Sequence, residues 1–244
     1  MVSRKFSGAS STYDSAASVQ AMVAYDLDLA IRSAAGKDAI PCARSLIEVG
    51  SGTGLFTMRY APFVAADALW RLWDIADVPE DAVPRGAVFV KADAELEIRE
   101  MPDNSVDAIL SSSALQWLGS PMRFIGECRR VLRPGGLLAF STFDSDNLPE
   151  LREMSPESAL VSPSFSDWSG WLAESFYVLQ ATRNKYQIQF ERPRQVLEHL
   201  RLTGVNGTVG SASGARRIME EYPRTSTGRC PLTYTPLVFV ACRR

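Results

Sequence analysis

Histidines and clustered cysteines are scarce in this chain of 244 residues. Its single histidine is His199, and its four cysteines, Cys42, Cys128, Cys230 and Cys242, are far apart. A zinc site needs about four nitrogen or sulfur ligands close together, so we expect no metal. A Ser-His-Asp hydrolase is disfavoured because no recognisable nucleophile motif accompanies the one histidine. We expect the cysteines to be reduced thiols of a cytoplasmic protein.

Long apolar runs and tracts of one charge are also missing. No run reaches about 18 apolar residues, so we expect no membrane-spanning helix. The first six residues include the basic pair Arg4 and Lys5, but a polar stretch at 7–11 follows instead of an apolar signal region, so export is not expected. The chain holds 26 basic and 28 acidic residues without a polybasic tract, which disfavours nucleic acid as a partner. With 46% hydrophobic residues, the composition predicts one globular domain.

Apolar segments of strand length alternate with amphipathic segments from residue 45 onward. Strands are expected at 45–49, 68–73, 87–91, 106–111, 137–142, 185–190 and 232–241, and helices within 14–35, 55–66, 121–132 and 193–202. Such alternation predicts an α/β fold with a seven-stranded, mostly parallel sheet and helices on both faces. Within this single domain we expect an N-terminal helical lid (1–40), a ligand-binding core (41–143), an inserted cap (144–182) and a C-terminal part that completes the sheet (183–244).

A glycine-rich loop carries the strongest functional signal. It reads Glu48-Val49-Gly50-Ser51-Gly52-Thr53-Gly54 and lies between the first predicted strand and its helix. Glycines there let the backbone turn tightly and approach a ligand. Asp74 ends the second strand, where a carboxylate can accept both hydroxyl protons of a ribose. Asp93-Ala94 follows the third strand, where an acid can accept an adenine amino group, and Ser111 to Ser113 end the fourth. Taken one at a time, each feature also fits a plain turn or a solvated strand end.

Two classes of nucleotide ligand compete for this loop. A dinucleotide fingerprint requires Gly-x-Gly-x-x-Gly, but Leu55 stands at the third glycine position. The form Glu-x-Gly-x-Gly-x-Gly instead resembles motif I of class I S-adenosylmethionine (SAM)-dependent methyltransferases. Asp93-Ala94, the segment 102–107 before strand four and the segment 132–136 before strand five are similar to the same superfamily. The resemblance implies a Rossmann-like methyltransferase fold with SAM as cofactor. We therefore expect these residues to bind it: Gln20, Glu48, Gly50, Ser51, Gly52, Gly54, Asp74, Ile75, Asp93, Ala94, Ser111 and Ser112.

Further stretches resemble one subfamily, the malonyl-acyl-carrier-protein O-methyltransferases of biotin synthesis. They run in order from residue 6 to 234: Phe6, Tyr13-Asp14, Ala17 and Gln20, then Ala114-Leu115-Gln116-Trp117, Phe140-Ser141-Thr142-Phe143, Leu148 to Arg152, His199-Leu200, Thr203-Gly204-Val205-Asn206 and Pro231-Leu232-Thr233-Tyr234. This resemblance implies methyl transfer from SAM to the free carboxylate of malonyl-acyl-carrier protein. The alternatives are SAM-dependent methylation of another small molecule, such as a quinone precursor or a small carboxylic acid, and a non-catalytic SAM-binding scaffold.

A carboxylate acceptor fits a chain without an evident acid-base pair. Carboxylic acids have pKa values of roughly 3 to 4, so the nucleophile is already ionised at pH 7 and needs no general base. Catalysis would then consist of positioning and of excluding water. For positioning we single out Tyr13, and for contact with the substrate Gln116 and Trp117.

Charge is distributed unevenly along the chain. Residues 183–244 hold 11 Lys or Arg and 4 Glu, a net charge of +7, whereas residues 1–182 carry −9. A basic surface beside the substrate entrance would steer an acidic carrier protein, although an ordinary solvated face has the same composition. The expected docking residues are Arg183, Lys185, Arg192, Arg194 and Arg201. No oligomeric state is predicted.

Overall fold

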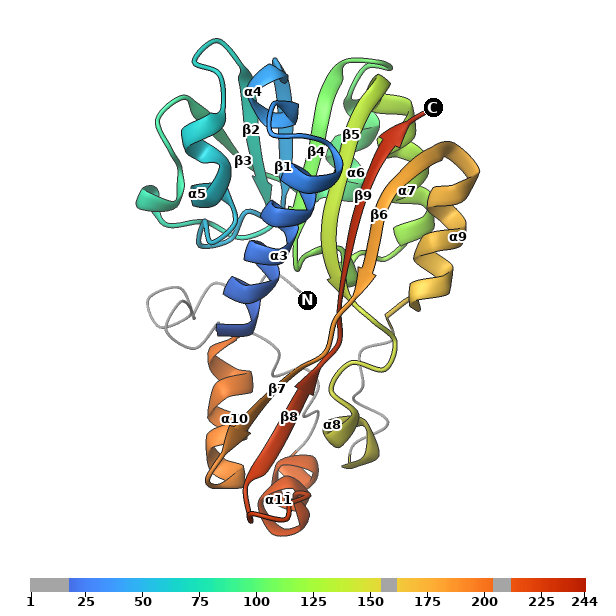
Figure 1. Ribbon diagram of the computed structural model, residues 1–244. Coiled ribbons are helices and arrows are strands. Elements are labelled where there is room, and N and C mark those ends of the chain that lie inside the picture. The colour runs from blue at the N-terminus through green and yellow to red at the C-terminus, as the bar shows by residue number, and fades with distance from the viewer. Residues whose placement is uncertain (1–17, 155–161, 204–211) are drawn as a thin grey trace.

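A sheet of seven strands forms the upper part of the molecule (Figure 1). The computed structural model describes residues 18–154, 162–203 and 212–244. The strands of this main sheet are β1 (Ser45–Val49), β2 (Leu69–Asp74), β3 (Ala87–Lys91), β4 (Val106–Ser112), β5 (Leu132–Phe143), β6 (Phe176–Arg183) and β9 (Pro236–Arg243). Their order is β3-β2-β1-β4-β5-β9-β6, and β9 is antiparallel to both of its neighbours while β1 to β5 pair in parallel. The predicted seven-stranded, mostly parallel sheet is confirmed.

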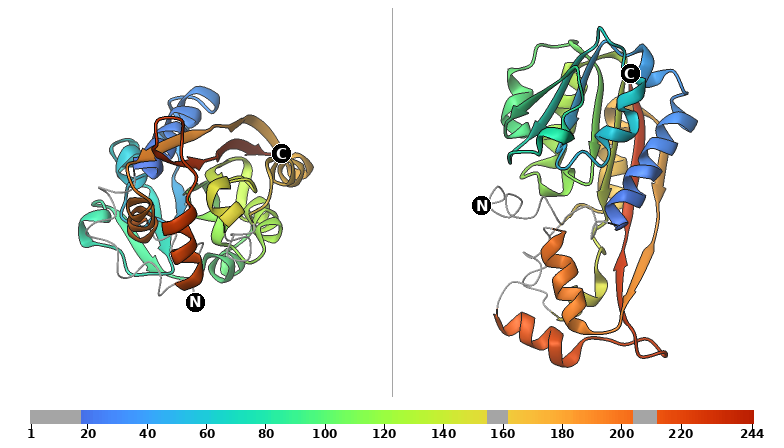
Figure 2. Two further views of the ribbon diagram at one scale, coloured as in Figure 1. Left: turned by 90° about the horizontal axis from the view of Figure 1, so that it is seen from below. Right: turned by 90° about the vertical axis from the view of Figure 1, so that its left-hand side faces the viewer.

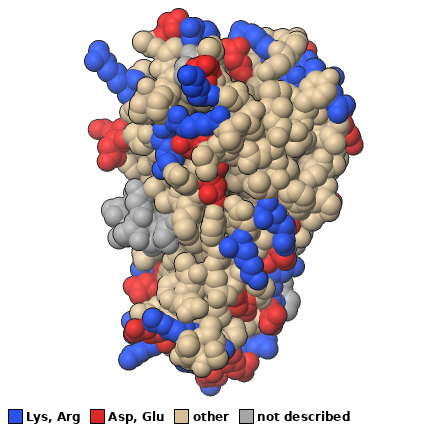
Figure 3. All heavy atoms as spheres, in the orientation of Figure 1, with Lys and Arg blue, Asp and Glu red and all other residues tan. Residues whose placement is uncertain are grey.

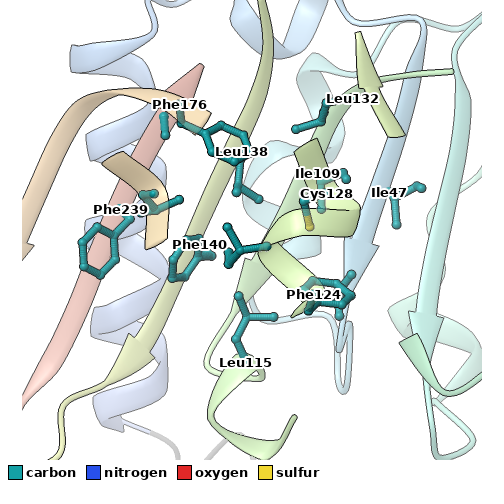
Figure 4. Close-up of a cluster of buried hydrophobic side chains, with 14 of the residues drawn as sticks. Ile47, Ile109, Leu115, Phe124, Cys128, Leu132, Leu138, Phe140, Phe176 and Phe239 are labelled. Atoms are coloured by element: carbon teal, nitrogen blue, oxygen red, sulfur yellow. The ribbon is translucent and has the colours of Figure 1, made fainter. Parts of the chain in front are cut away.

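Helices cover both faces of the main sheet. On one face lie α3 (Ser18–Ala34), α4 (Ala39–Cys42) and α5 (Thr57–Tyr60), and on the other α6 (Ala94–Glu100), α7 (Pro121–Val131) and α9 (Phe165–Ser175). Figure 4 shows the second face, where Phe124 and Cys128 of α7 meet Ile47, Ile109 and Phe140 from the strands. Because both faces are covered, the central strands are buried on both sides: β1 is buried throughout, and β5 carries the continuous apolar run Leu137 to Phe140.

A second, smaller lobe lies below the carboxyl ends of β1 to β5 (Figures 1 and 2). It is built from the two-stranded sheet of β7 (Tyr186–Phe190) and β8 (Cys230–Tyr234), with α8 (Pro149–Met154), α10 (Pro193–Leu202) and α11 (Ala212–Glu221). Its core includes Leu151, Val196, Leu200, Ile218 and Leu232. We call this part the lower lobe.

Three expected elements differ from the structure. The predicted strand 185–190 exists as β7, but it pairs with β8 in the lower lobe, and β6 takes its place in the main sheet. The predicted strand 232–241 is divided into β8 and β9 at Thr235, whose N–H donates to Asn147 Oδ1 (2.9 Å) instead of to a strand. The expected helix 55–66 contains only the four residues of α5 and a 3-10 turn, η1 (Ala61–Phe63).

The expected cap also differs. Within 144–182, α9 inserts Trp168 into the core of the main sheet and β6 forms its edge, so only α8 belongs to the lower lobe. Within 183–244, only β9 completes the main sheet, and β7, β8, α10 and α11 build the lower lobe.

Candidate functional site

A cavity of about 270 Å³ lies at the carboxyl ends of β1 to β4. Residues that follow each of these strands line it: 50–53 after β1, 75–79 after β2, 92–95 after β3, and 113, 114, 117 and 118 after β4. The strand order reverses between β1 and β4, with β2 and β3 on one side and β5 on the other. In open α/β sheets this switch point is where ligands bind. The predicted position of the site is therefore the position of the cavity.

The glycine loop is bound to its neighbours through backbone groups. Gly50 and Ser51 both donate their N–H to the carbonyl of Trp73, at 2.8 and 3.2 Å. Gly50 has φ +71°, and a Cβ placed there would lie 2.3 Å from the Cβ of Ala114. Glycine is therefore required at position 50, both by the left-handed backbone and by close approach to the segment after β4.

Asp74 faces the cavity from the end of β2. Its Oδ2 accepts the N–H of Gly52 and its Oδ1 accepts the N–H of Ala76, both at 2.9 Å. Burial raises the pKa of Asp74, and the backbone donors partly offset this. A carboxylate has about four acceptor positions, so each oxygen keeps one for a ligand hydroxyl. This arrangement suits the predicted ribose contact.

The other predicted residues after β2 and β3 also line the cavity. Ile75 is 37% exposed and contributes an apolar edge. Asp93 caps α6 by accepting the N–H of Glu95 at 2.9 Å, and Ala94 follows it along the wall.

Glu48 lines the cavity, but its carboxylate is engaged behind the loop. Its Oε2 accepts the hydroxyls of Thr57 (2.7 Å) and Tyr60 (2.5 Å), and Trp70 donates to the Tyr60 oxygen (3.1 Å). Burial raises the pKa of Glu48 to about 7, and the two hydroxyl donors partly offset this. The residue therefore fixes α5 against β1, directly beneath the glycine loop.

Four buried polar atoms around the cavity have no hydrogen-bond partner within the described chain. They are Gln20 Oε1, Ser51 Oγ, Trp73 Nε1 and Ser113 Oγ. Unpartnered buried polar atoms are costly and uncommon, and a bound polar ligand would satisfy them. Gln20 reaches the cavity from α3 and is 6% exposed.

Three predicted site residues among those described do not line the cavity. Gly54 has φ +82° and is buried against Ala82, where a Cβ on residue 54 would lie 3.2 Å from the Ala82 Cβ. Ser111 is buried and donates to the Val49 carbonyl at 2.9 Å, so it holds β4 to β1 instead of binding a ligand. Gln116 donates to the Ser113 carbonyl at 2.5 Å and accepts from Thr142 Oγ1 at 3.2 Å, so it supports the wall from behind. Ser111 and Gln116 were chosen because they lie at or after the end of a strand that ends at the site, but their side chains point elsewhere.

Ser112 and Trp117 do line the cavity, as predicted, whereas Tyr13 lies outside the described residues. The sequence placed Ser113 at the end of strand four, but only Ser111 and Ser112 were selected as site residues; the φ of Ser113, +55°, is unusual for a residue other than glycine. Sequence reasoning missed Glu95, which accepts the N–H groups of Gly119 (2.7 Å) and Ser120 (2.8 Å). No sequence pattern marks either role.

The charge of the cavity lining is one-sided. Its carboxyl groups are Glu48, Asp74, Asp77, Asp93 and Glu95, and no Lys, Arg or His is among the described residues that line it. The cavity therefore favours a ligand that carries positive charge. Across the described ranges no cluster of His, Cys, Asp or Glu could hold a metal ion, and no helix is long and apolar enough to cross a membrane.

The five predicted docking residues are all exposed, but they are not equivalent. Arg183 binds Asp144 and Asp146 at 2.5 Å each, at the joint between the main sheet and the lower lobe. Its role is structural. Arg192 and Arg194 lie at the start of α10, Arg201 lies near its end, and Lys185 precedes β7.

The helix α10 belongs to the lower lobe and shares an apolar cluster with α3, the helix that carries Gln20. Val196 and Leu200 of α10 share one apolar cluster with Val19 and Val23 of α3, and Gln20 between those valines lines the cavity. Figure 3 shows Lys and Arg over the lower lobe, interspersed with Asp and Glu.

Comparison with known proteins agrees with this geometry. A family model described as a methyltransferase domain matches residues 47–140. A methyltransferase structure from Bacillus halodurans superposes with a TM-score of 0.62 at 17% identity, covering 89% of this chain and 98% of that one. The YcgJ protein of Bacillus subtilis superposes with a TM-score of 0.63 at 15% identity, covering 90% and 98%. The fold and the site define a class I methyltransferase, the class that uses SAM.

The sequence relationship is narrower. The malonyl-[acyl-carrier protein] O-methyltransferase of Haemophilus influenzae is 33% identical over 81% of this chain and 77% of its own length. The proteins of the same name from Porphyromonas gingivalis (35%, covering 80% and 78%) and Chlorobium phaeovibrioides (31%, covering 100% and 96%) are similar to a comparable degree. The chain belongs to the malonyl-[acyl-carrier protein] O-methyltransferase family.

Proposed function

We propose that this protein transfers the methyl group of SAM to the free carboxylate of a malonyl group carried by acyl carrier protein. The observation that carries the proposal is the relationship to enzymes of that name, which extends over at least 80% of the chain in each of the three relatives above. We also place the protein in the cytoplasm, which its four unpaired cysteines support.

The residues of the cavity fit SAM. SAM carries positive charge on its sulfonium and ammonium groups, which matches the four carboxyl residues of the lining besides Glu48. Asp74 would accept the ribose hydroxyls, Asp93 would accept the adenine amino group, and Gln20 Oε1 would accept from the ammonium group. When bound, SAM supplies a methyl group attached to a positively charged sulfur.

The chain has to align and shield the acceptor, not ionise it. A lone pair of the carboxylate oxygen forms the new carbon–oxygen bond, the electron pair of the methyl–sulfur bond stays on sulfur, and no proton moves. Because a negative and a positive charge cancel in this step, a site that excludes water favours it. Trp73, Trp117 and Leu118 provide an apolar wall of this kind.

The exposed cations of α10 support a carrier protein as the acceptor. Arg192 and Arg194 lie at the start of α10, Arg201 lies near its end, and Lys185 precedes β7. The end of α10 with Arg201 is the one nearer to α3, and Arg192 and Arg194 lie at the opposite end (Figure 1). Cations on the lobe below the carboxyl ends of β1 to β5 would steer an acidic carrier and raise its association rate.

The direct test is methyl transfer from labelled SAM to malonyl-carrier protein, with acetyl-carrier protein as the control. We expect label on the malonyl form alone, released as methanol by mild base. Transfer to a different small molecule would refute the acceptor, and SAM binding without transfer to any acceptor would favour a non-catalytic scaffold.

The docking proposal has its own test. The double variant Arg192→Glu/Arg194→Glu should lower kcat/KM for malonyl-carrier protein about tenfold or more at low salt while changing that for malonyl-coenzyme A much less. A matched control, Arg123→Glu/Arg129→Glu, makes the same change in net charge on exposed positions of α7. Equal losses on both substrates, or an equal loss in the control, would remove α10 from the docking surface.

A further inference from the structure

Ser113 is held in a constrained backbone conformation at the cavity wall. Its φ is +55°, in the left-handed region that residues other than glycine seldom adopt. Its N–H donates to the carbonyl and to the Oγ of Ser141, both at 3.1 Å, and its carbonyl accepts from Gln116 Nε2 at 2.5 Å. Strain of this kind persists when the surroundings impose it, and it is found mostly at functional sites.

The hydroxyl of Ser113 is unused. Its Oγ is buried without a hydrogen-bond partner in the described part of the chain, and Ser113 lines the cavity. The neighbouring Ser112 differs, because its Oγ lies 3.2 Å from the Oγ of Ser141. A ligand atom or a bound water can complete the hydrogen bonding of the Ser113 hydroxyl, and its place on the cavity wall makes it available to a ligand.

The place of Ser113 in the sheet assigns it to the reacting end of the site. Asp74, the last residue of β2, and Asp93, which follows β3, are the nucleoside residues of the proposed function and lie on one side of β1. Ser113 follows β4 on the other side, and the adjacent Ala114 lies against Gly50. A ligand with its nucleoside over β2 and β3 therefore has its other end beside Ser113.

The acceptor carboxylate needs a donor at that end, and the described lining contains no Lys, Arg or His to provide it. A neutral hydroxyl suits the chemistry better than a cation, because it orients the carboxylate while leaving the negative charge on the attacking oxygen. Ser51 Oγ is the other unpartnered hydroxyl of the described lining, but it belongs to the loop after β1, on the side of the cofactor.

We propose that Ser113 Oγ donates a hydrogen bond to the acceptor carboxylate and so aims its other oxygen at the methyl group. The hydroxyl keeps its proton throughout, and Gln116 and Ser141 act as positioning residues that hold the Ser113 backbone. This inference rests on the proposed function, since it takes the acceptor to be a carboxylate.

Three substitutions at one position separate the hydroxyl from the backbone. Ser113→Ala removes the hydroxyl and keeps the strain. Ser113→Gly removes the hydroxyl and relieves the strain, because glycine accepts a positive φ. Ser113→Asn tolerates the left-handed backbone and restores a donor. The measurements are kcat and KM for malonyl-carrier protein, the calorimetric Kd for SAM, and the melting temperature as a check of folding. Ser51→Ala is the matched control.

We expect Ser113→Ala and Ser113→Gly both to lose about 10- to 100-fold in kcat/KM for malonyl-carrier protein, with the SAM Kd within about twofold and with partial recovery in Ser113→Asn. Ser51→Ala should weaken SAM binding instead. Full activity of Ser113→Gly would mean that only the backbone matters, and an equal loss of SAM affinity would assign Ser113 to the cofactor; either result overturns the inference. Wild-type protein without activity on malonyl-carrier protein would refute the proposed function as well, which distinguishes the two failures.

Discussion

Replacing Gly50 with alanine should destabilise the protein by about 2 to 5 kcal/mol. Two effects add. A left-handed conformation costs a residue other than glycine about 1 to 2 kcal/mol, and Gly50 has φ +71°. The new Cβ would also lie 2.3 Å from the Cβ of Ala114, and overpacking of this kind costs about 1 to 3 kcal/mol. The measurement is the free energy of unfolding in urea without ligand.

Two companion variants divide that cost. Gly52 has φ +51°, but a Cβ at this position would have nothing within 4 Å, so Gly52→Ala should cost only the backbone part, about 1 to 2 kcal/mol. In Gly50→Ala/Ala114→Gly the clash is gone, so the double variant should recover most of the packing part, less the small cost of a new glycine. If Gly50→Ala unfolded at the same urea concentration as Gly52→Ala, the close approach to Ala114 would carry no energy and the reasoning would fail.

Two further results are expected from the cavity carboxylates. Asp74→Asn should weaken SAM binding by about 1.5 to 3 kcal/mol, the scale of hydrogen bonds to a charged group; an unchanged calorimetric Kd would exclude Asp74 from the ribose contact. Burial raises the pKa of Glu48 from 4.5 to about 7, so near neutral pH the folded protein binds a proton that the unfolded chain has released. Binding this proton stabilises the folded state, and that stabilisation is lost as pH rises from about 5 to 7. Between pH 5 and 8 the wild type should lose about 3 kcal/mol of unfolding free energy through Glu48, and Glu48→Gln should not show this loss. Parallel pH profiles of the unfolding free energy for variant and wild type would contradict the raised pKa.

The sequence predicted the five parallel strands and the site at their ends for a physical reason. Strands such as β1 are buried on both faces, so they appear as short apolar runs between turn signals, and the glycine loop and Asp74 follow two of them. The edge strand β6 gave no such run, because Tyr177 and its neighbours face solvent. The division of the last strand depends on Asn147, which is distant in sequence and binds Thr235.

Side-chain direction and backbone strain were beyond the sequence as well. Ser111, Ser112 and Ser113 form a run of one residue type, yet their hydroxyls differ. The Ser111 hydroxyl binds a strand carbonyl, the Ser112 hydroxyl binds another serine, and the Ser113 hydroxyl has no partner in the described chain. The conformation of Ser113 arises from Ser141 and Gln116, which tertiary structure brings to it.

The one-sided charge of the cavity bears on product release. The carboxyl residues of the lining other than Glu48 favour a ligand that enters with a sulfonium charge, and the reaction removes that charge. The same walls therefore hold the thioether left behind with less electrostatic attraction than they held the incoming donor. Residues that take no part in bond making therefore favour the exchange of spent for fresh cofactor. Added salt should narrow the difference between the affinity for SAM and the affinity for its thioether product.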